Sequence, residues 1–179
     1  METRHRTLRD LTATFVQTYR SGALGREVKE SGLLSLKNPG RMLWEYQQPE
    51  KKTFVSNGKS FYFYVPADKQ VIVRDQADLR GIPALLLSGR GDILSQFQVT
   101  ALDAPAGRRR LRLVPRKKDA EVEEVVLEVD ETARIVGIQV LDGSGNRSHF
   151  AFAQVRENVG LKDQIFEFKV PRGVEVITG

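Results

Sequence analysis

The chain has 179 residues, of which 40% are hydrophobic and 28% charged, a composition typical of one globular domain. It contains no cysteine, which excludes disulfides and thiol catalysis, and no apolar stretch approaches the roughly 20 residues that span a bilayer. The net charge of +5 permits attraction to nucleic acid or anionic lipid without requiring either.

The N-terminal segment is predicted to be an amphipathic helix over residues 6–20. Leu8, Leu11, Phe15 and Tyr19 recur there at three- and four-residue steps, and the segment contains no Gly or Pro. The charged start of the chain lacks the basic-then-apolar pattern of a secretory leader. We therefore expect either a cytosolic protein or an exported protein whose leader is absent from this sequence.

Strands are predicted from residue 26 onward, where apolar and polar residues alternate with a two-residue period. Asn57 and Gly58 favour a type I′ hairpin turn, in which both central residues have positive φ. The alternation breaks at 81–97, where Pro83 suits a first helical turn, so we expect a short helix or lid there. The strands before this break are expected at 26–37, 41–48, 51–56, 59–66 and 69–75.

Strands return after this break, and the short linkers between them indicate one mainly antiparallel β domain, residues 1–179. The basic run at 108–118 and the acidic run at 121–131 are expected to pair as a hairpin with opposite charges on its outer face, instead of binding nucleic acid. The sequence DGSGN at 142–146 is interpreted as a hairpin turn. The later strands are expected at 97–103, 108–115, 121–130, 134–142, 147–156 and 165–170.

The sequence offers little that resembles a catalytic or metal site. His5 and His149 are the only histidines, and neither stands in an HExxH spacing. No GxSxG motif is present. We therefore expect a protein that is not an enzyme and uses no metal or cofactor.

The conspicuous residues are aromatic. Met42, Trp44 and Tyr46 alternate along one face of a predicted strand, and residues 61–64 (FYFY) place large aromatic side chains on both faces of another. Such stripes usually belong to a core, and periodicity alone leaves core and cavity wall equally open. It also leaves open which face of 61–64 points inward.

The order of these segments resembles the LolA family of periplasmic lipoprotein carriers over nearly the whole chain. The resemblance rests on LTATFVQ (11–17), GLLSLKNPGRMLWEYQQPE (32–50), SNGKSFYFYVPADKQV (56–71), IPALLLSGRGDI (82–93) and IFEFKVPRGVEV (165–176). Within them, the matching residues are Lys37, Pro39, Trp44, Pro49, Ser56, Gly58, Lys59, Tyr64, Pro66, Gln70 and Val71.

This resemblance implies a half-open, strongly curved antiparallel β-barrel of about ten or eleven strands, with an N-terminal helix and a short helical lid. It implies a non-enzymatic periplasmic carrier that shields the acyl chains of lipoproteins in an apolar cavity. Its partners would be acylated lipoproteins, an inner-membrane lipoprotein-releasing ABC transporter and an outer-membrane lipoprotein receptor, and it would act as a monomer. The alternative is a LolB-like receptor or a stress-sensing lipid-binding domain on the same barrel.

The resemblance also assigns residues to the cavity. Relatives close their lid with an arginine before the proline, and here that position is Asn38, so Arg41 is considered as a substitute latch. Met42 stands where many relatives have phenylalanine, and its flexible side chain still suits an acyl pocket. The predicted wall is Met42, Trp44, Tyr46, Phe61 and Phe63, and the predicted lid side is Phe15, Leu85, Leu86 and Leu87.

Overall fold

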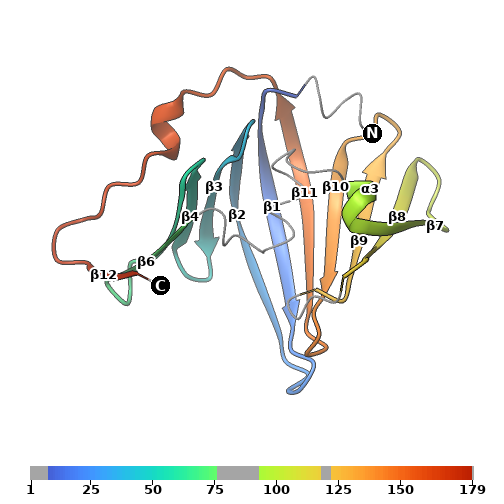
Figure 1. Ribbon diagram of the computed structural model, residues 1–179, viewed down its shortest axis with the longest axis horizontal. Helices are drawn as coiled ribbons and strands as arrows, with labels where there is room; N and C mark the ends of the chain where they lie inside the picture. The colour runs from blue at the N-terminus through green and yellow to red at the C-terminus, as the bar shows by residue number, and fades with distance from the viewer. Residues whose placement is uncertain (1–7, 76–92, 118–121, 179) are drawn as a thin grey trace.

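The computed structural model describes residues 8–75, 93–117 and 122–178, and its strands form one open, twelve-stranded sheet (Figure 1). The strand order is β12-β6-β5-β4-β3-β2-β1-β11-β10-β9-β8-β7. Neighbours are antiparallel, except that β12 runs parallel to β6. The strands are β1 (Asp10–Arg20), β2 (Glu27–Lys37), β3 (Arg41–Gln48), β4 (Lys52–Asn57), β5 (Ser60–Val65), β6 (Gln70–Asp75), β7 (Phe97–Leu102), β8 (Arg108–Pro115), β9 (Glu124–Asp130), β10 (Ile135–Leu141), β11 (Arg147–Glu157) and β12 (Glu175–Thr178).

The sheet is strongly curved, as the distance between two aromatic rings shows. Trp44 lies on β3 and Phe150 on β11, and β2 and β1 lie between these strands. Three strand spacings in a flat sheet amount to about 14 Å. The two ring centroids are only 5.5 Å apart, so the face that carries them is the concave one.

We call this concave side the inner face and the opposite side the outer face. The main hydrophobic core lies on the inner face and draws residues from β1, β2, β3, β7, β8, β9, β10 and β11. Its most deeply buried members include Phe15, Leu34, Leu113, Leu127 and Ile138. The core therefore lies on the concave side of the curved sheet.

The predicted N-terminal helix is wrong, because residues 10–20 form β1, which pairs with β2 on one side and β11 on the other. The pattern misled because Leu11, Phe15 and Tyr19 are four residues apart, and four residues are two full periods of a strand as well as about one helical turn. The β-branched residues of the segment, Thr12, Thr14 and Val16, favour the strand.

The curvature and the open edges of the predicted half-open barrel are confirmed, but its about ten or eleven antiparallel strands need correction, since the sheet of the described residues has twelve strands and one parallel pair. Residues 165–170 are not a strand. Residues 163–166 form the 3-10 turn η2 (Asp163–Phe166), and the last strand is β12. Apolar residues alternate in this segment because Phe166 is buried and Phe168 packs on Tyr62 and Tyr64, not because the backbone joins the sheet.

All three predicted hairpins form, including the one across the turn at 142–146 between β10 and β11, with one change in turn geometry. Strands β4 and β5 pair across Asn57 and Gly58, but only Gly58 has positive φ, at 95°. The Asn57 side chain instead accepts hydrogen bonds from the backbone N–H groups of Lys59 and Ser60, both at 2.9 Å, so the turn is not type I′.

The basic and acidic strands β8 and β9 pair as predicted. Arg112 lies 2.6 Å from Glu124, and Arg108 lies 3.7 Å from Glu128. Helical structure in the described residues is limited to η2 and the short α3 (Ile93–Gln96). None of the helices among those residues has the length and hydropathy needed to span a bilayer.

After β11 the chain leaves the sheet and crosses the outer face before it rejoins the sheet as β12 (Figure 1). We call residues 158–174 the C-terminal strap. The turn η2 lies within it and contacts β3 and β4. Phe166 is fully buried, and Phe168 lies 5.4 Å from the ring of Tyr62 on the outer face of β5. The strap therefore covers the back of the strands that carry the predicted cavity wall.

Candidate binding face

An aromatic cluster forms the centre of the inner face. The ring of Phe15 lies 5.0 Å from that of Trp44 and 4.9 Å from that of Tyr46, both in edge-to-face geometry. Trp44 in turn contacts Phe150 and Phe152 on β11. Such pairs contribute about 0.5–1.5 kcal/mol each beyond the area they bury. The cluster joins β1, β3 and β11 into one apolar surface.

The structure brings together most of the residues predicted for the cavity wall. Met42, Trp44 and Tyr46 are buried on the inner face with Phe15. Their role in binding stays a prediction. Leu85, Leu86 and Leu87 lie outside the described residues.

Register decides the orientation that the sequence left open for residues 61–64. Phe54 is opposite both Trp44 and Phe63, so Phe63 points to the inner face, and Phe61 follows it there. The rings of Phe54 and Phe63 stack at 4.3 Å, and both residues are half-buried. Tyr62 and Tyr64 point to the outer face, where they contact the strap. Phe54 stands on this face as well, although it is absent from the predicted wall.

Gly32 on β2 makes room for the contact between Phe15 and Tyr46. It is opposite both residues in the sheet, at an irregularity in the pairing of β2 with β3. A Cβ atom at this position would lie 2.0 Å from the carbonyl oxygen of Glu45. No side chain fits there without displacement of the β3 backbone, so the close approach of the two aromatic rings depends on this glycine.

Four polar side chains, which we call the polar quartet, border the aromatic cluster at one end of the inner face: Gln17, Glu30, Tyr46 and Lys52. The Tyr46 hydroxyl donates to Oε1 of Gln17 at 2.6 Å, and Nζ of Lys52 donates to Oε1 of Glu30 at 2.6 Å. The Lys52 ammonium also lies 4.4 Å from the centroid of the Tyr46 ring. Burial, and secondly the Glu30 carboxylate, raise the pKa of Tyr46 far above its ordinary value, so the phenol remains a donor.

Sequence reasoning found Tyr46 but missed Gln17, Glu30 and Lys52. They come from three strands, and only the successive pairing of β1, β2, β3 and β4 puts them side by side. The signal available beforehand was weak. Each is a polar residue at an inner-face position of a strand whose other inner-face positions are largely apolar.

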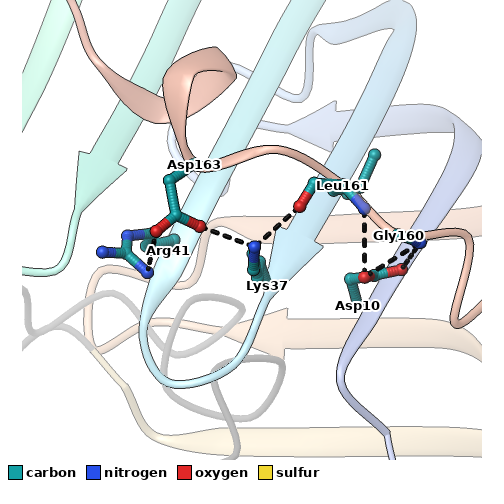
Figure 2. Close-up of polar contacts among 6 residues, drawn as sticks. All are labelled: Asp10, Lys37, Arg41, Gly160, Leu161 and Asp163. Carbon is teal, nitrogen blue, oxygen red and sulfur yellow. Dashed lines mark hydrogen bonds and ion pairs between the residues drawn. The ribbon is translucent and has the colours of Figure 1, made fainter.

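Asp10 binds the beginning of the strap through its buried carboxylate (Figure 2). Backbone N–H groups of Val159, Gly160 and Leu161 donate to its two oxygens, the shortest at 2.7 Å. Gly160 has a φ of 77°, which helps three successive N–H groups converge on one anion. The carboxylate thus fixes the start of the strap to β1.

Lys37 and Arg41, the residues opposite one another on β2 and β3, bind the strap next to this point (Figure 2). Nζ of Lys37 donates to the Leu161 carbonyl at 2.7 Å and lies 2.6 Å from Asp163, and Arg41 lies 3.3 Å from Asp163. The hydrogen bond from Lys37 contributes most to lowering the pKa of Asp163, desolvation opposes it, and the charges of Arg41 and Lys37 lower it further. The strap therefore carries an anion that two cations of the sheet bind.

These contacts give the two predicted latch residues other partners. Arg41 binds Asp163 of the strap, and Nδ2 of Asn38 donates to the Leu8 carbonyl at 2.7 Å. Residues 81–92 of the segment predicted as a short helix or lid lie outside the described residues, and its end forms α3 at Ile93–Gln96, so a latch between the lid and Asn38 or Arg41 stays a prediction. No cluster of three or more His, Asp or Glu suited to a metal occurs in the described part of the chain.

The chain matches the sequence profile of the family "Outer membrane lipoprotein carrier protein LolA" over residues 6–169. It is 37% identical over 171 residues to the outer-membrane lipoprotein carrier protein of Azotobacter vinelandii. That alignment covers 93% of this chain and 81% of the relative. It is 34% identical over 171 residues to the protein of the same name from Pseudomonas aeruginosa, and that alignment covers 93% of this chain and 80% of the relative.

Solved structures share the fold at low identity. An uncharacterized conserved protein from Thermus thermophilus superposes with a TM-score of 0.62 at 13% identity, covering 99% of this chain and 95% of that one. A putative outer membrane lipoprotein-sorting protein domain from Vibrio parahaemolyticus superposes with a TM-score of 0.50 at 13% identity, and the superposition covers 92% of this chain and 94% of that one. The family match and the relatives above 30% identity go beyond fold, and they show that the chain belongs to the LolA family of outer-membrane lipoprotein carrier proteins.

Proposed function

We propose that this protein carries acylated lipoproteins through the periplasm and shields their acyl chains against the inner face of its sheet. The observation that carries the proposal is the aromatic inner face around Phe15 and Trp44, which spans β1, β3 and β11 of a curved sheet. Each methylene removed from water contributes about 0.8 kcal/mol, so acylated cargo needs such a surface to cross an aqueous compartment. Shielding requires no bond to be broken, which fits a carrier that is not an enzyme.

The cargo would come from an inner-membrane lipoprotein-releasing ABC transporter and pass to an outer-membrane lipoprotein receptor. The relatives named as carriers, at 37% and 34% identity, favour a carrier over a LolB-like receptor or a stress sensor. A non-directional apolar surface also suits this role, because it binds acyl chains without geometric demands and leaves them free to be transferred.

Trp44 is the only tryptophan, so its emission reports directly on the inner face. We expect palmitate to change this emission and to displace a hydrophobic fluorophore from the purified protein. Phe63→Ala should weaken both effects about tenfold, because a half-buried ring of the proposed wall is lost. Leu33→Ala is the matched control, because Leu33 is 39% exposed and points to the outer face.

The cargo itself is tested by size-exclusion chromatography without detergent. A purified triacylated lipoprotein should elute with the carrier, and the same lipoprotein without its acyl chains should not. Mass spectrometry should recover the lipoprotein with its acyl chains intact. Coelution of the unacylated form, an unresponsive Trp44, or hydrolysis of the chains would each contradict the proposal.

A further inference from the structure

The polar quartet borders the apolar part of the inner face on β1 to β4. One row across the sheet consists of Ala13, Leu34, Trp44, Phe54 and Phe63, which are opposite one another in sequence on β1 to β5. The next row on the same face, about 7 Å away along the strands, contains Tyr46 and Lys52. Gln17 and Glu30 are opposite each other one row further. On the β2 to β4 side the surface therefore changes within two rows from aromatic to hydrogen-bonding, whereas Phe15 of β1 stands in the first of these rows and Gln17 is opposite the buried Phe150 of β11 in the second.

The quartet has more donors than it uses. The Lys52 ammonium carries three N–H donors, and Glu30 accepts one of them. The Gln17 oxygen accepts from Tyr46, whereas its NH2 group has no acceptor among the described residues. The side chains of Lys52 and Glu30 are 25% and 13% exposed, so the pair is sheltered but within reach of a ligand on the inner face. The unused N–H donors of Lys52 and Gln17 can therefore bind a hydrogen-bond acceptor of a ligand.

An ester carbonyl or a carboxylate at the end of an alkyl chain has the complementary chemistry. Both are acceptors without a donor, and both continue into an apolar chain. We propose that the polar quartet binds the carbonyl or carboxylate head of an acyl ligand, while the chain lies along the row of Trp44 and Phe54. This inference rests on the proposed acyl-binding function and adds an orientation to it.

The experiment compares ligands that differ only in their head. The ligands are palmitate, methyl palmitate and the hydrocarbon probe diphenylhexatriene, which has no polar head. The variant is Glu30→Gln with Lys52→Met, which removes both charges together and keeps the lysine stem, so that neither charge is left unpaired. Lys29→Met is the matched control, because Lys29 is an exposed lysine on the outer face of β2.

We expect the double variant to bind palmitate about tenfold more weakly and to bind diphenylhexatriene with unchanged affinity, since a charge-assisted hydrogen bond is lost and the apolar surface is not. A matching loss for methyl palmitate assigns the contact to the carbonyl oxygen, and a loss for palmitate alone assigns it to the carboxylate. Both outcomes support the inference. Lys29→Met should change none of the affinities.

The inference is overturned if the double variant binds all three ligands as the wild type does, or loses affinity for all three equally. A thermal unfolding curve close to that of the wild type establishes that the variant is folded. Failure of the proposed function would give a different result from failure of this inference, because the wild-type protein itself would then bind none of the three ligands.

Discussion

At the scale of single residues, the inner face depends on Gly32. We expect Gly32→Ala to lower the free energy of unfolding by about 3 kcal/mol, because the new Cβ would overlap the backbone of β3 and not a movable side chain. The midpoint of urea denaturation measures this change. The same substitution should alter Trp44 emission, since Phe15 and Tyr46 approach each other over this glycine.

The neighbouring position supplies the control for this prediction. Ser31 is half-buried on the opposite face of β2, opposite Val16 of β1. Its substitution by alanine removes only a hydroxyl, and we expect a change in stability within about 0.5 kcal/mol. Equal effects of the two substitutions would show that β3 yields readily to a side chain at position 32.

Residue-scale prediction from the sequence worked where a role follows from position in one strand. The alternation around Trp44 places Met42, Trp44 and Tyr46 on one face, and the structure buries all three there. It failed where a role depends on pairing between strands. Lys52 on β4 binds Glu30 on β2 across the intervening β3. The alternation of residues within β2 or within β4 cannot predict this contact.

At the scale of elements, the C-terminal strap shows what alternation cannot determine. Phe166 and Phe168 have the spacing of a strand because they pack on a sheet, although their own backbone lies outside it. Likewise Leu11, Phe15 and Tyr19 fit a helix and a strand equally well, and β1 is decided by the two strands beside it. Tertiary pairing overrides a local pattern in both elements.

The ion pairs of Asp163 should make the protection of the strap depend on pH. Because the pKa of Asp163 is lowered from its ordinary 3.8 by its contacts with Lys37 and Arg41, its contribution to holding the strap is complete above pH 3.8 and is lost as the pH falls through the lowered value. Asp163→Asn removes this contribution at every pH. We expect amide hydrogen exchange in residues 159–166 to be a few-fold faster in the variant at pH 7.

The same measurement in acid tests the assignment. Wild type and Asp163→Asn should converge in strap exchange once the pH has fallen through the lowered pKa of Asp163, where the wild-type carboxyl becomes neutral as well. Asp68→Asn, in the turn between β5 and β6, is the control and should leave strap exchange unchanged. A difference between wild type and Asp163→Asn that persists unchanged at a pH where titration of the wild type shows the Asp163 carboxyl to be neutral would show that its charge is not the cause.

At the scale of the whole molecule, the sequence predicts mainly β structure and the resemblance predicts its curvature, but neither predicts how the sheet ends. β1 pairs with β11 across more than a hundred residues, and β12 pairs with β6, so the strand order reflects contacts distant in sequence. Four C-terminal residues form the parallel strand β12. A strand so short gives almost no periodic signal of its own.

That strand covers an edge that would otherwise be available for pairing. Without β12, the edge strand would be β6, which carries Val71, Ile72 and Val73. Exposed edges with such residues pair readily with other chains. We expect a chain that ends after Gly173 to self-associate with increasing concentration, as measured by sedimentation velocity, while the chain ending at 179 does not.

A second substitution separates loss of edge protection from general loss of folding. Val73 points to the outer face of β6, opposite Tyr62, and a lysine there discourages further strand pairing without a charge in the core. Val73→Lys in the shortened chain should therefore restore a single monomeric species. If the shortened chain associates equally with and without this lysine, the association arises elsewhere, for example from Phe168 after its strap loses the attachment at β12. If it does not associate at all, β12 serves chiefly to hold the strap across the outer face, and its loss should then appear as faster exchange of Tyr62 and Tyr64 amides.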